Sequence, residues 1–281
     1  MIYKVFYPSD SIKDFIKYYW YMEDHVGNPK EKDLLIPDLS SELIFNFDTL
    51  YHRFSLRQDV KENITKSCLI GQRSISIIAN RPSKVRLFGI KFKPGALFSF
   101  FGIPEKELKN SSISLSDLNS NSLIELEDKI LNQKKIKLLP AQLDQYFIQK
   151  LKSFELVDLN IFNSYLKKIA RLKDASELES FRAENQIHYK KLERLFARYA
   201  GISARSFIKI NRFKNFYKAF NKGQHNFYNS SIYEFGYYDQ NHFIKDFTFF
   251  TNQNPSQYYK IETQLTDSIL IQTLDFLKKA R

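Results

Sequence analysis

The strongest constraint on this chain of 281 residues is an internal repeat in its C-terminal part, at a constant offset of 51 residues. Large apolar residues recur at that offset: Leu192 with Phe243, Phe196 with Phe247, Tyr199 with Phe250, and Phe207 with Tyr258. Apolar residues three and four positions apart share one face of a helix. Two copies are too few for a solenoid, so we expect two versions of one small helical motif.

The signals that end and restart helices recur at the same offset. Gly201 corresponds to Asn252, and both residue types tolerate the left-handed backbone conformation that closes a helix. Ala204 corresponds to Pro255, a residue that suits the first turn of a following helix. Each copy therefore predicts a helix, a left-handed stop and a further helix.

The whole chain has a net charge of +12, and its positive charge is concentrated in the same C-terminal part. Residues 1–163 contain 23 lysines and arginines against 20 acidic residues, whereas residues 164–281 contain 20 against 11. The segment 187–222 has ten basic residues and one acid, Glu193. A basic stripe of this density is typical of a polyanion-binding surface, although a highly soluble surface without a partner would show the same charge.

The composition is that of a soluble globular protein with two domains. Hydrophobic residues make up 43% of the chain and aromatic residues 16%, which favours packed cores over disorder. No run approaches the roughly 18 apolar residues that cross a bilayer, and Met1–Asp10 lacks the core of a signal peptide. The single Cys68 excludes an internal disulfide framework and a cysteine-based zinc site. We expect a cytoplasmic protein with no membrane partner.

The N-terminal half predicts a mixture of strands and helices. Ser41–Asp48 alternates as a half-buried strand does. Ser83–Lys93 alternates similarly, with a slip in phase near Gly89 that indicates a bulge. Ala96–Phe101 then predicts a short helix closed by Gly102.

Each copy of the repeat contains a helix whose polar face carries long side chains. These side chains are Tyr189, Lys190, Lys191, Glu193 and Arg194 in the first copy, and Gln240, Asn241, His242 and Lys245 in the second. Amide, imidazole and cationic groups pair with base edges and phosphates. A plain surface helix shows the same division, usually with more glutamate. Arg205–Lys222 is long enough for a helix that holds two major-groove helices about 34 Å apart.

Residues 187–220 and 231–260 resemble the DNA-binding domain of the AraC/XylS family. The most specific match is Gly236-Tyr237-Tyr238-Asp239-Gln240 followed by His242-Phe243. The resemblance covers about residues 157–262. It implies seven helices, two helix-turn-helix units and a long linking helix at about 204–221, with Gly236 in the turn of the second unit and Arg212 on the linking helix.

By position, the resemblance implies base contacts from Tyr189, Lys190, Glu193 and Arg194 in the first unit, and from Gln240, Asn241, His242 and Lys245 in the second. The chain departs from the family at His188, where serine is usual, and at Arg182 and Ile232, where alanine is usual. Ser231 and Ala204 replace an aliphatic residue and a proline. A large residue at a tight helix crossing would splay it, so the first unit is expected to be shifted or to read DNA weakly.

The N-terminal part resembles an uncharacterised domain often found ahead of this DNA-binding unit. The matching motifs are Ile36-Pro37-Asp38, Ile70-Gly71-Gln72-Arg73 and Gly89–Gly95. The glycines and prolines are explained by turns. Asp38, Arg73, Lys91 and Lys93 are candidates either for binding a polar ligand or for an internal ion pair.

Together these observations predict an α+β sensor or dimerisation domain over 1–120, a helical connector over 121–155, an all-α DNA-binding domain with two helix-turn-helix motifs over 156–263, and a helical tail over 264–281. The fold class is thus an α+β N-terminal domain followed by an all-α domain whose two motifs are joined by a long helix.

We expect a transcription regulator whose partner is double-stranded DNA, with RNA polymerase, a small-molecule effector and a second copy as further possible partners. Lys214 is expected to be exposed on the linking helix, where it would contact phosphate if it contacts DNA. No catalytic residue, metal site or cofactor is expected, because the five histidines lack ligand spacing and no phosphate-binding glycine loop occurs. The alternative is a small-molecule-binding or partner-binding protein with a degenerate DNA-binding domain.

Overall fold

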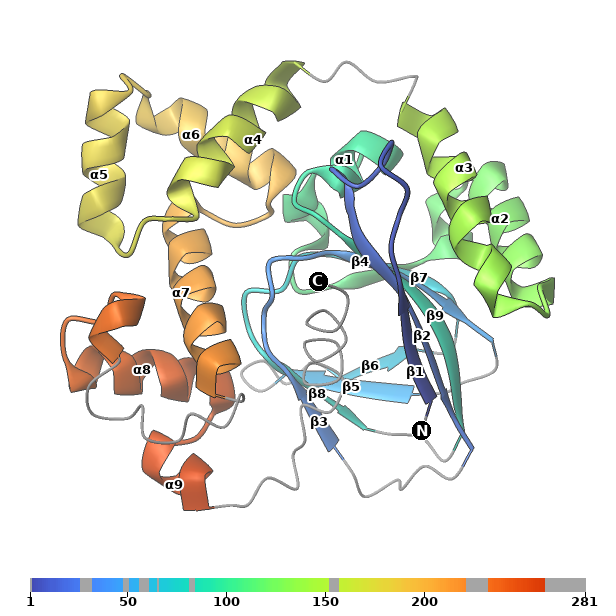
Figure 1. Cartoon of the computed structure of the whole chain (residues 1–281), viewed down its shortest axis with the longest axis horizontal. Helices are drawn as coiled ribbons and strands as arrows, with labels where there is room; N and C mark the ends of the chain where they lie inside the picture. Colours follow the sequence, from blue (N-terminus) through green and yellow to red (C-terminus); the bar gives the residue numbers. More distant parts are fainter. Residues whose placement is uncertain are drawn as a thin grey trace.

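The computed structural model describes residues 2–25, 32–47, 51–55, 61–64, 66–80, 84–151, 157–220 and 232–260. They form a β-rich N-terminal part and a helical C-terminal part that lie side by side (Figure 1). The predicted fold class is confirmed. The tail predicted over 264–281 lies outside the described residues. No helix within the described ranges is long and apolar enough to span a membrane.

The N-terminal part contains two antiparallel sheets. The larger has the strand order β1 (Ile2–Phe6), β2 (Ile16–Asp24), β9 (Val85–Phe92), β4 (Glu42–Asn46), β7 (Cys68–Ile70) and β10 (Ser112–Ser114). The smaller has the order β3 (Lys32–Leu35), β8 (Ile77–Asn80), β5 (Tyr51–Ser55) and β6 (Lys61–Ile64). Ile64 of β6 packs with Trp20 and Leu87 of the larger sheet, so the two sheets share a hydrophobic cluster.

The bulge predicted at Gly89 is wrong. β9 pairs with β2 and β4 through Gly89 without interruption. Both faces of β9 are buried, so large apolar residues occupy both faces and do not alternate with polar residues. Gly89 is small because the indole ring of Trp20 lies over it, and a Cβ at Gly89 would come within 2.0 Å of that ring.

The irregularity in this sheet lies instead on β2. Ile16 pairs with Phe92 and Tyr18 with Lys91, so Lys17 is the extra residue. A bulge bends its strand and redirects the extra side chain. Lys17 therefore leaves the regular alternation of β2.

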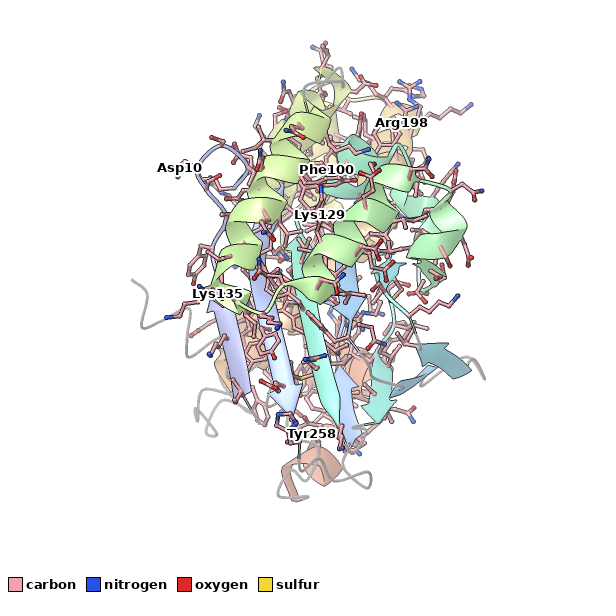
Figure 2. All side chains as sticks on the ribbon, turned by 90° about the vertical axis from the view of Figure 1, so that its right-hand side faces the viewer. Asp10, Phe100, Lys129, Lys135, Arg198 and Tyr258 are labelled. Atoms are coloured by element: carbon pink, nitrogen blue, oxygen red, sulfur yellow. The ribbon has the colours of Figure 1, made fainter. Side chains whose placement is uncertain are left out.

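Two helices cover the face of the larger sheet opposite the smaller one (Figure 2). The segment after β9 contains α1 (Ala96–Phe101), η1 (Glu105–Leu108), η2 (Leu115–Leu118), α2 (Asn121–Asn132), η3 (Ile136–Leu138) and α3 (Leu139–Leu151). The short helix predicted at Ala96–Phe101 is confirmed, and Gly102 closes it with φ 69°.

The helices of the expected connector share a core with the sheet. Leu126 of α2 and Phe147 of α3 belong to the same cluster as Phe92 of β9. The rings of Phe100 and Phe147 lie 4.5 Å apart. We therefore propose that the part of 121–155 that contains α2 and α3 belongs to the N-terminal structural unit.

The C-terminal part contains α4 (Val157–Ile169), α5 (Ala175–Glu184), α6 (Tyr189–Tyr199), α7 (Ala204–Phe220), η5 (Ile232–Phe235), α8 (Gln240–Thr251) and α9 (Pro255–Lys260). The predicted repeat is confirmed, because α6 and α8 begin 51 residues apart and so do α7 and α9. The predicted stops are confirmed too: Gly201 has φ 68° and Asn252 has φ 59°.

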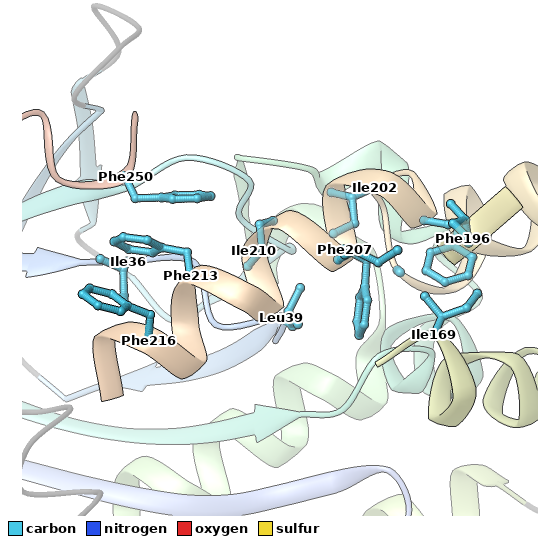
Figure 3. Packing of buried hydrophobic residues seen from close by; sticks show 14 of the residues in the cluster. Ile36, Leu39, Ile169, Phe196, Ile202, Phe207, Ile210, Phe213, Phe216 and Phe250 are labelled. Carbon is cyan, nitrogen blue, oxygen red and sulfur yellow. The ribbon is translucent and has the colours of Figure 1, made fainter. Parts of the chain in front are cut away.

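The linking helix α7 forms the junction of the two parts. Its buried residues include Ile210, Phe213 and Phe216 (Figure 3). Ile36 and Leu39 of the N-terminal part belong to the same cluster. The hydrophobic core is therefore continuous from the loop after β3 to the helical part.

We expect Gly89→Ala to lower the free energy of unfolding by about 1–3 kcal/mol, because the added methyl group forces Trp20 to move in a packed core. Urea unfolding followed by tryptophan fluorescence measures the change, since Trp20 is the only tryptophan. Lys84→Ala, at an exposed position just ahead of the same strand, is the control. Equal stability of the two variants would contradict the role given to Gly89.

Candidate nucleic-acid interface

The helix predicted to be the first recognition helix, α6, presents its polar residues to solvent. Its buried face consists of Leu192, Leu195, Phe196 and Tyr199. Lys190 and Arg194 are exposed, Tyr189 is 49% exposed and Glu193 is half-buried. The four side chains predicted to contact bases therefore lie along one accessible face of α6.

A histidine caps this helix. His188 stands where the family resemblance expects serine, and its Nδ1 accepts a hydrogen bond from the backbone N–H of Lys190 at 3.2 Å. An N-cap acceptor satisfies one of the amide groups that the start of a helix leaves unpaired. The imidazole of His188 thus fills the role of the missing hydroxyl.

Arg182, at the position where the resemblance expects alanine, makes contacts beside α6. Its guanidinium group pairs with Glu179 and lies 5.2 Å from the centre of the Tyr189 ring. Glu179 also accepts a hydrogen bond from Arg205 of α7 at 2.8 Å. The large side chain therefore links α5 to the first residue of α6.

The helix predicted to be the second recognition helix, α8, has the same organisation. Its buried face consists of Phe243, Asp246, Phe247, Phe250 and Thr251. Asp239 is the N-cap, and its Oδ1 accepts a hydrogen bond from the backbone N–H of His242 at 2.7 Å. Gln240, Asn241 and Lys245 are exposed. Three of the four side chains predicted to contact bases thus face solvent.

The turns ahead of the two recognition helices differ by one residue. Gly236, predicted to lie in the turn of the second unit, has φ 88° and is confirmed there, four residues before α8 begins. In the first unit the left-handed residue is Gln186, with φ 51°, three residues before α6 begins. The offset of 51 therefore holds from the recognition helices onward but not through the preceding turns.

His242 differs from its neighbours because its ring contacts α7. Its Nε2 lies 2.9 Å from Nη2 of Arg212, and its ring stacks on Tyr238 at a centroid distance of 5.7 Å. Burial and the positive charge of Arg212 lower the pKa of His242. The neutral ring accepts the hydrogen bond of the guanidinium group, a partner that the sequence did not indicate.

Arg212 holds the second unit in place. Its Nη2 lies 2.6 Å from Oδ2 of Asp246, and both side chains are over 90% buried. Its Nη1 donates to the carbonyl oxygens of Lys173 at 3.1 Å and Gly236 at 3.4 Å. The guanidinium carbon lies 4.6 Å from the centre of the Tyr237 ring. One side chain of α7 therefore contacts α8, the turn before it and the loop between α4 and α5.

The position of Arg212 within α7 is a sequence signal for this role, which its residue type alone is not. Arg212 lies four residues after Ile208 and four before Phe216, so it falls on the apolar face of α7. A charged residue is rarely buried unless it is paired. An arginine in that phase therefore predicts an internal partner.

Tyr238 and Asp174 form a second contact between the two units. The Tyr238 hydroxyl donates a hydrogen bond to Oδ2 of Asp174, the N-cap of α5. Burial alone would raise the pKa of Asp174, but hydrogen bonds from Ser176, Tyr238 and the backbone lower it to about 2. The carboxylate is thus ionised at neutral pH and joins the start of α5 to the turn before α8.

The ligand candidates of the N-terminal part fall into two places. Lys91 pairs with Asp38 at 3.0 Å and with Glu42, and all three side chains are largely buried. Burial alone would raise the pKa of both carboxyls, but the charges of Lys91 and Arg73 hold each pKa below its usual value. This geometry is that of an internal ion-pair cluster. Lys93 lies apart from it and lines a cavity beside α4.

The expectation that Lys214 is exposed on α7 is wrong. It is half-buried and lines the same cavity, next to residues of β2 and of the loop after β3. Its burial depends on the packing of the N-terminal part against α7, which the local sequence around Lys214 does not report. Lys214 is therefore unsuited to the phosphate contact expected of it.

We expect Asp246→Ala to lower the free energy of unfolding by about 3–5 kcal/mol, because it leaves the Arg212 charge buried without its partner. Asp158→Ala is the matched control: Asp158 pairs with Arg198 at 3.4 Å with both side chains 40% or more exposed, and its loss should cost less than about 1 kcal/mol. Chemical denaturation measures both. A loss for Asp246→Ala no larger than that of the control would contradict the role of the buried pair.

Comparison with known proteins gives one family match, within the N-terminal part. Residues 4–114 match the family model described as a domain of unknown function (DUF6597). This range lies where the sequence predicted an uncharacterised domain. No curated protein matches the chain.

Several solved structures overlap with this one at low sequence identity, among them structures of ToxT and CuxR. ToxT from Vibrio cholerae O395 is 12% identical, with a TM-score of 0.45 over 91% of this chain and 99% of that chain. Wild-type ToxT from Vibrio cholerae strain SCE256 with a bound unsaturated fatty acid is 13% identical, with a TM-score of 0.43 over 85% and 92%. The AraC-like transcriptional activator CuxR is 14% identical, with a TM-score of 0.26 over 79% and 88%.

Proposed function

We propose that this chain is a sequence-specific DNA-binding transcription regulator that inserts α6 and α8 into two adjacent segments of the major groove. The observation that carries the proposal is the repeated construction of these helices. Each begins at an N-cap, buries an apolar face and leaves its first turns polar and accessible. A major groove admits an α-helix, and the first turns of recognition helices contact the base edges.

The exposed side chains of α6 suit guanine and phosphate. Arg194 has the forked donors that pair with O6 and N7 of guanine. Lys190 offers a charge to guanine or to phosphate, and Glu193 accepts from the amino group of cytosine. Tyr189 offers a hydroxyl to the backbone.

The exposed side chains of α8 suit adenine. Gln240 and Asn241 have side-chain amides, which pair with N6 and N7 of adenine. Lys245 offers a charge to guanine or phosphate. His242 is proposed to contribute mainly by positioning, because Arg212 already occupies its Nε2.

The proposed spacing follows from α7, which lies between the two recognition helices in the chain. Arg212 and its partners limit movement of α8 relative to α7. Helices that enter successive major grooves on one face of DNA lie about 34 Å apart, or one helical turn. A two-part site with about one turn between its centres is therefore expected.

The N-terminal part is proposed to sense an effector or to dimerise. It contacts the end of α6 directly, since the rings of Phe98 and Tyr199 lie 5.3 Å apart. A Cβ at Gly201, just after α6, would lie 2.8 Å from the carbonyl oxygen of Glu105. A change in this part would therefore reach the first recognition helix without an intermediary. Contact with RNA polymerase and homodimerisation stay predictions.

Selection of bound DNA from a random pool by the full chain tests the proposed function. Enrichment of a two-part site, bound with an affinity that falls steeply as salt is raised, is the expected result. Salt-insensitive weak binding with no enriched sequence would overturn the proposal and favour the degenerate-domain alternative.

Arg194→Ala should weaken binding to the selected site by about 1–3 kcal/mol and relax the preference at one base pair, because a bidentate contact to guanine is lost. Fluorescence anisotropy on the selected site and its single-base variants measures both effects. Lys129→Ala, an exposed change on α2, is the charge-matched control and should leave both unchanged. Uniform weakening without relaxed preference would assign Arg194 to phosphate instead.

A further inference from the structure

A cavity of about 890 Å³ lies between the N-terminal part and helices α4 and α7. Its volume is within the range of small-molecule sites. Phe15 and Leu39 of the N-terminal part and Leu159 and Phe207 of the helical part give it apolar walls. Both halves of the chain thus contribute to one concave surface.

The charged side chains of this cavity are strongly unbalanced. Its lining includes Lys17, Lys93, Lys167, Arg171 and Lys214, against one acidic residue, Asp14. Lys168 also lines the cavity, but its Nζ donates to Oδ1 of Asn185 at 3.1 Å and is already engaged. Without a bound anion, the remaining positive charges repel one another across the cavity.

Two of these lysines, Lys17 and Lys214, are half-buried. The bulge on β2 places Lys17 here, where it donates to Ser40 and to the carbonyl oxygen of Asp38. Burial lowers the pKa of Lys17 to about 8, although the negative charge of Asp38 acts to raise it. Neither Ser40 nor the carbonyl oxygen carries a charge that would balance the ammonium group.

Lys214 of α7 approaches from the other side. Burial, followed by the charges of Lys17 and Lys218, lowers its pKa to about 7, and Asp38 offsets this only in part. In the described parts of the chain, no hydrogen bond or ion pair holds the Lys214 ammonium group. Lys214 is half-buried, and a charge partly removed from water without a partner is unfavourable. An anion from solution would supply that partner.

We propose that this cavity is a binding site for a phosphate-bearing small organic molecule, with Lys17 and Lys214 as its anion-binding residues. A phosphate ester carries about two charges and three acceptor oxygens, which matches several ammonium groups converging from different elements. A monocarboxylate would leave most of these charges uncompensated. The apolar walls would hold the organic part.

The site also has a regulatory consequence, which rests on the proposed function. Lys17 and Lys214 come from the two halves of the chain, and Lys214 is on the helix that links the recognition helices. A ligand that bridges them stabilises one arrangement of the halves. It changes DNA affinity to the extent that its own affinity differs between the free and the DNA-bound chain.

Isothermal titration of the full chain with adenosine 5′-monophosphate, pyrophosphate and dodecanoate tests the ligand class. Binding of the first two, and not of dodecanoate, is expected. Absence of binding by both phosphate-bearing probes would overturn the proposal, and so would binding of dodecanoate in their place.

Variants locate the binding. Lys17→Met and Lys214→Met should each weaken adenosine 5′-monophosphate binding about thirtyfold or more, because each removes one side of a buried charge pair. Lys190→Met on α6 and Lys129→Met on α2 are matched controls and should bind normally. Lys214→Met removes a half-buried charge that has no partner, so it should fold at least as stably as the unaltered chain. Equal weakening by Lys190→Met would place the anion on the DNA-facing surface and overturn the assignment.

Proton uptake on ligand binding distinguishes direct anion binding by Lys214 from a purely structural role of this residue. At pH 8 an anion beside Lys214 should draw a proton onto it, so the binding heat should vary with the ionisation enthalpy of the buffer. Lys214→Met should reduce that dependence, and an unchanged dependence would contradict the role of Lys214.

DNA affinity, measured with and without the phosphate-bearing probe, is a separate experiment. A chain that binds the probe but no DNA would refute the proposed function and leave the proposed phosphate site unaffected.

Discussion

The buried ion pair between Arg212 and Asp246 is the interaction on which the helical C-terminal part of this structure depends. Two charges removed from water need each other, because an unpaired charge in the protein interior costs several kcal/mol. Asp246 is on α8 and Arg212 on α7, so the helices cannot turn or slide apart without breaking the pair. The other bonds of Arg212 extend that constraint to the turn at Gly236 and to the loop at Lys173. The charge pair therefore fixes a geometry, where apolar packing alone would tolerate alternatives.

The same helix also carries the packing between the two parts of the chain. Phe213 and Phe216 of α7 pack against Phe247 of α8, and the same cluster includes Ile36 and Leu39 from the N-terminal part (Figure 3). Interiors packed at this density transmit displacements instead of absorbing them. A shift of the loop after β3 is therefore felt along α7, on which the proposed spacing of α6 and α8 depends.

Local features of this fold could be predicted from the sequence, and long-range ones could not. The repeat, the left-handed stops at Gly201 and Asn252 and the helix at Ala96–Phe101 depend on neighbouring residues, which the sequence displays. The bulge was assigned to Gly89 because the apolar alternation slips there, but burial of both faces of β9 gives the same pattern, and only the fold brings Trp20 over Gly89. Lys214 lies 197 positions from Lys17, so no local pattern shows that they line one cavity. The partners of Arg212 and His242 were missed for the same reason.

Both helix-turn-helix units pack on α7 with buried apolar residues, and they differ in the charged contacts that accompany this packing. The second unit is fixed to α7 by buried charges around Arg212. The first packs on α7 through Phe196 and Phe207, whose rings lie 5.8 Å apart. Its ion pair with α7, between Glu179 and Arg205, has side chains that are 44% and 61% exposed, and exposed pairs contribute little. Its recognition helix ends against Phe98 and Glu105 of the N-terminal part. The buried charges around Arg212 thus add to the packing of α8, and α6 is in direct contact with the N-terminal part.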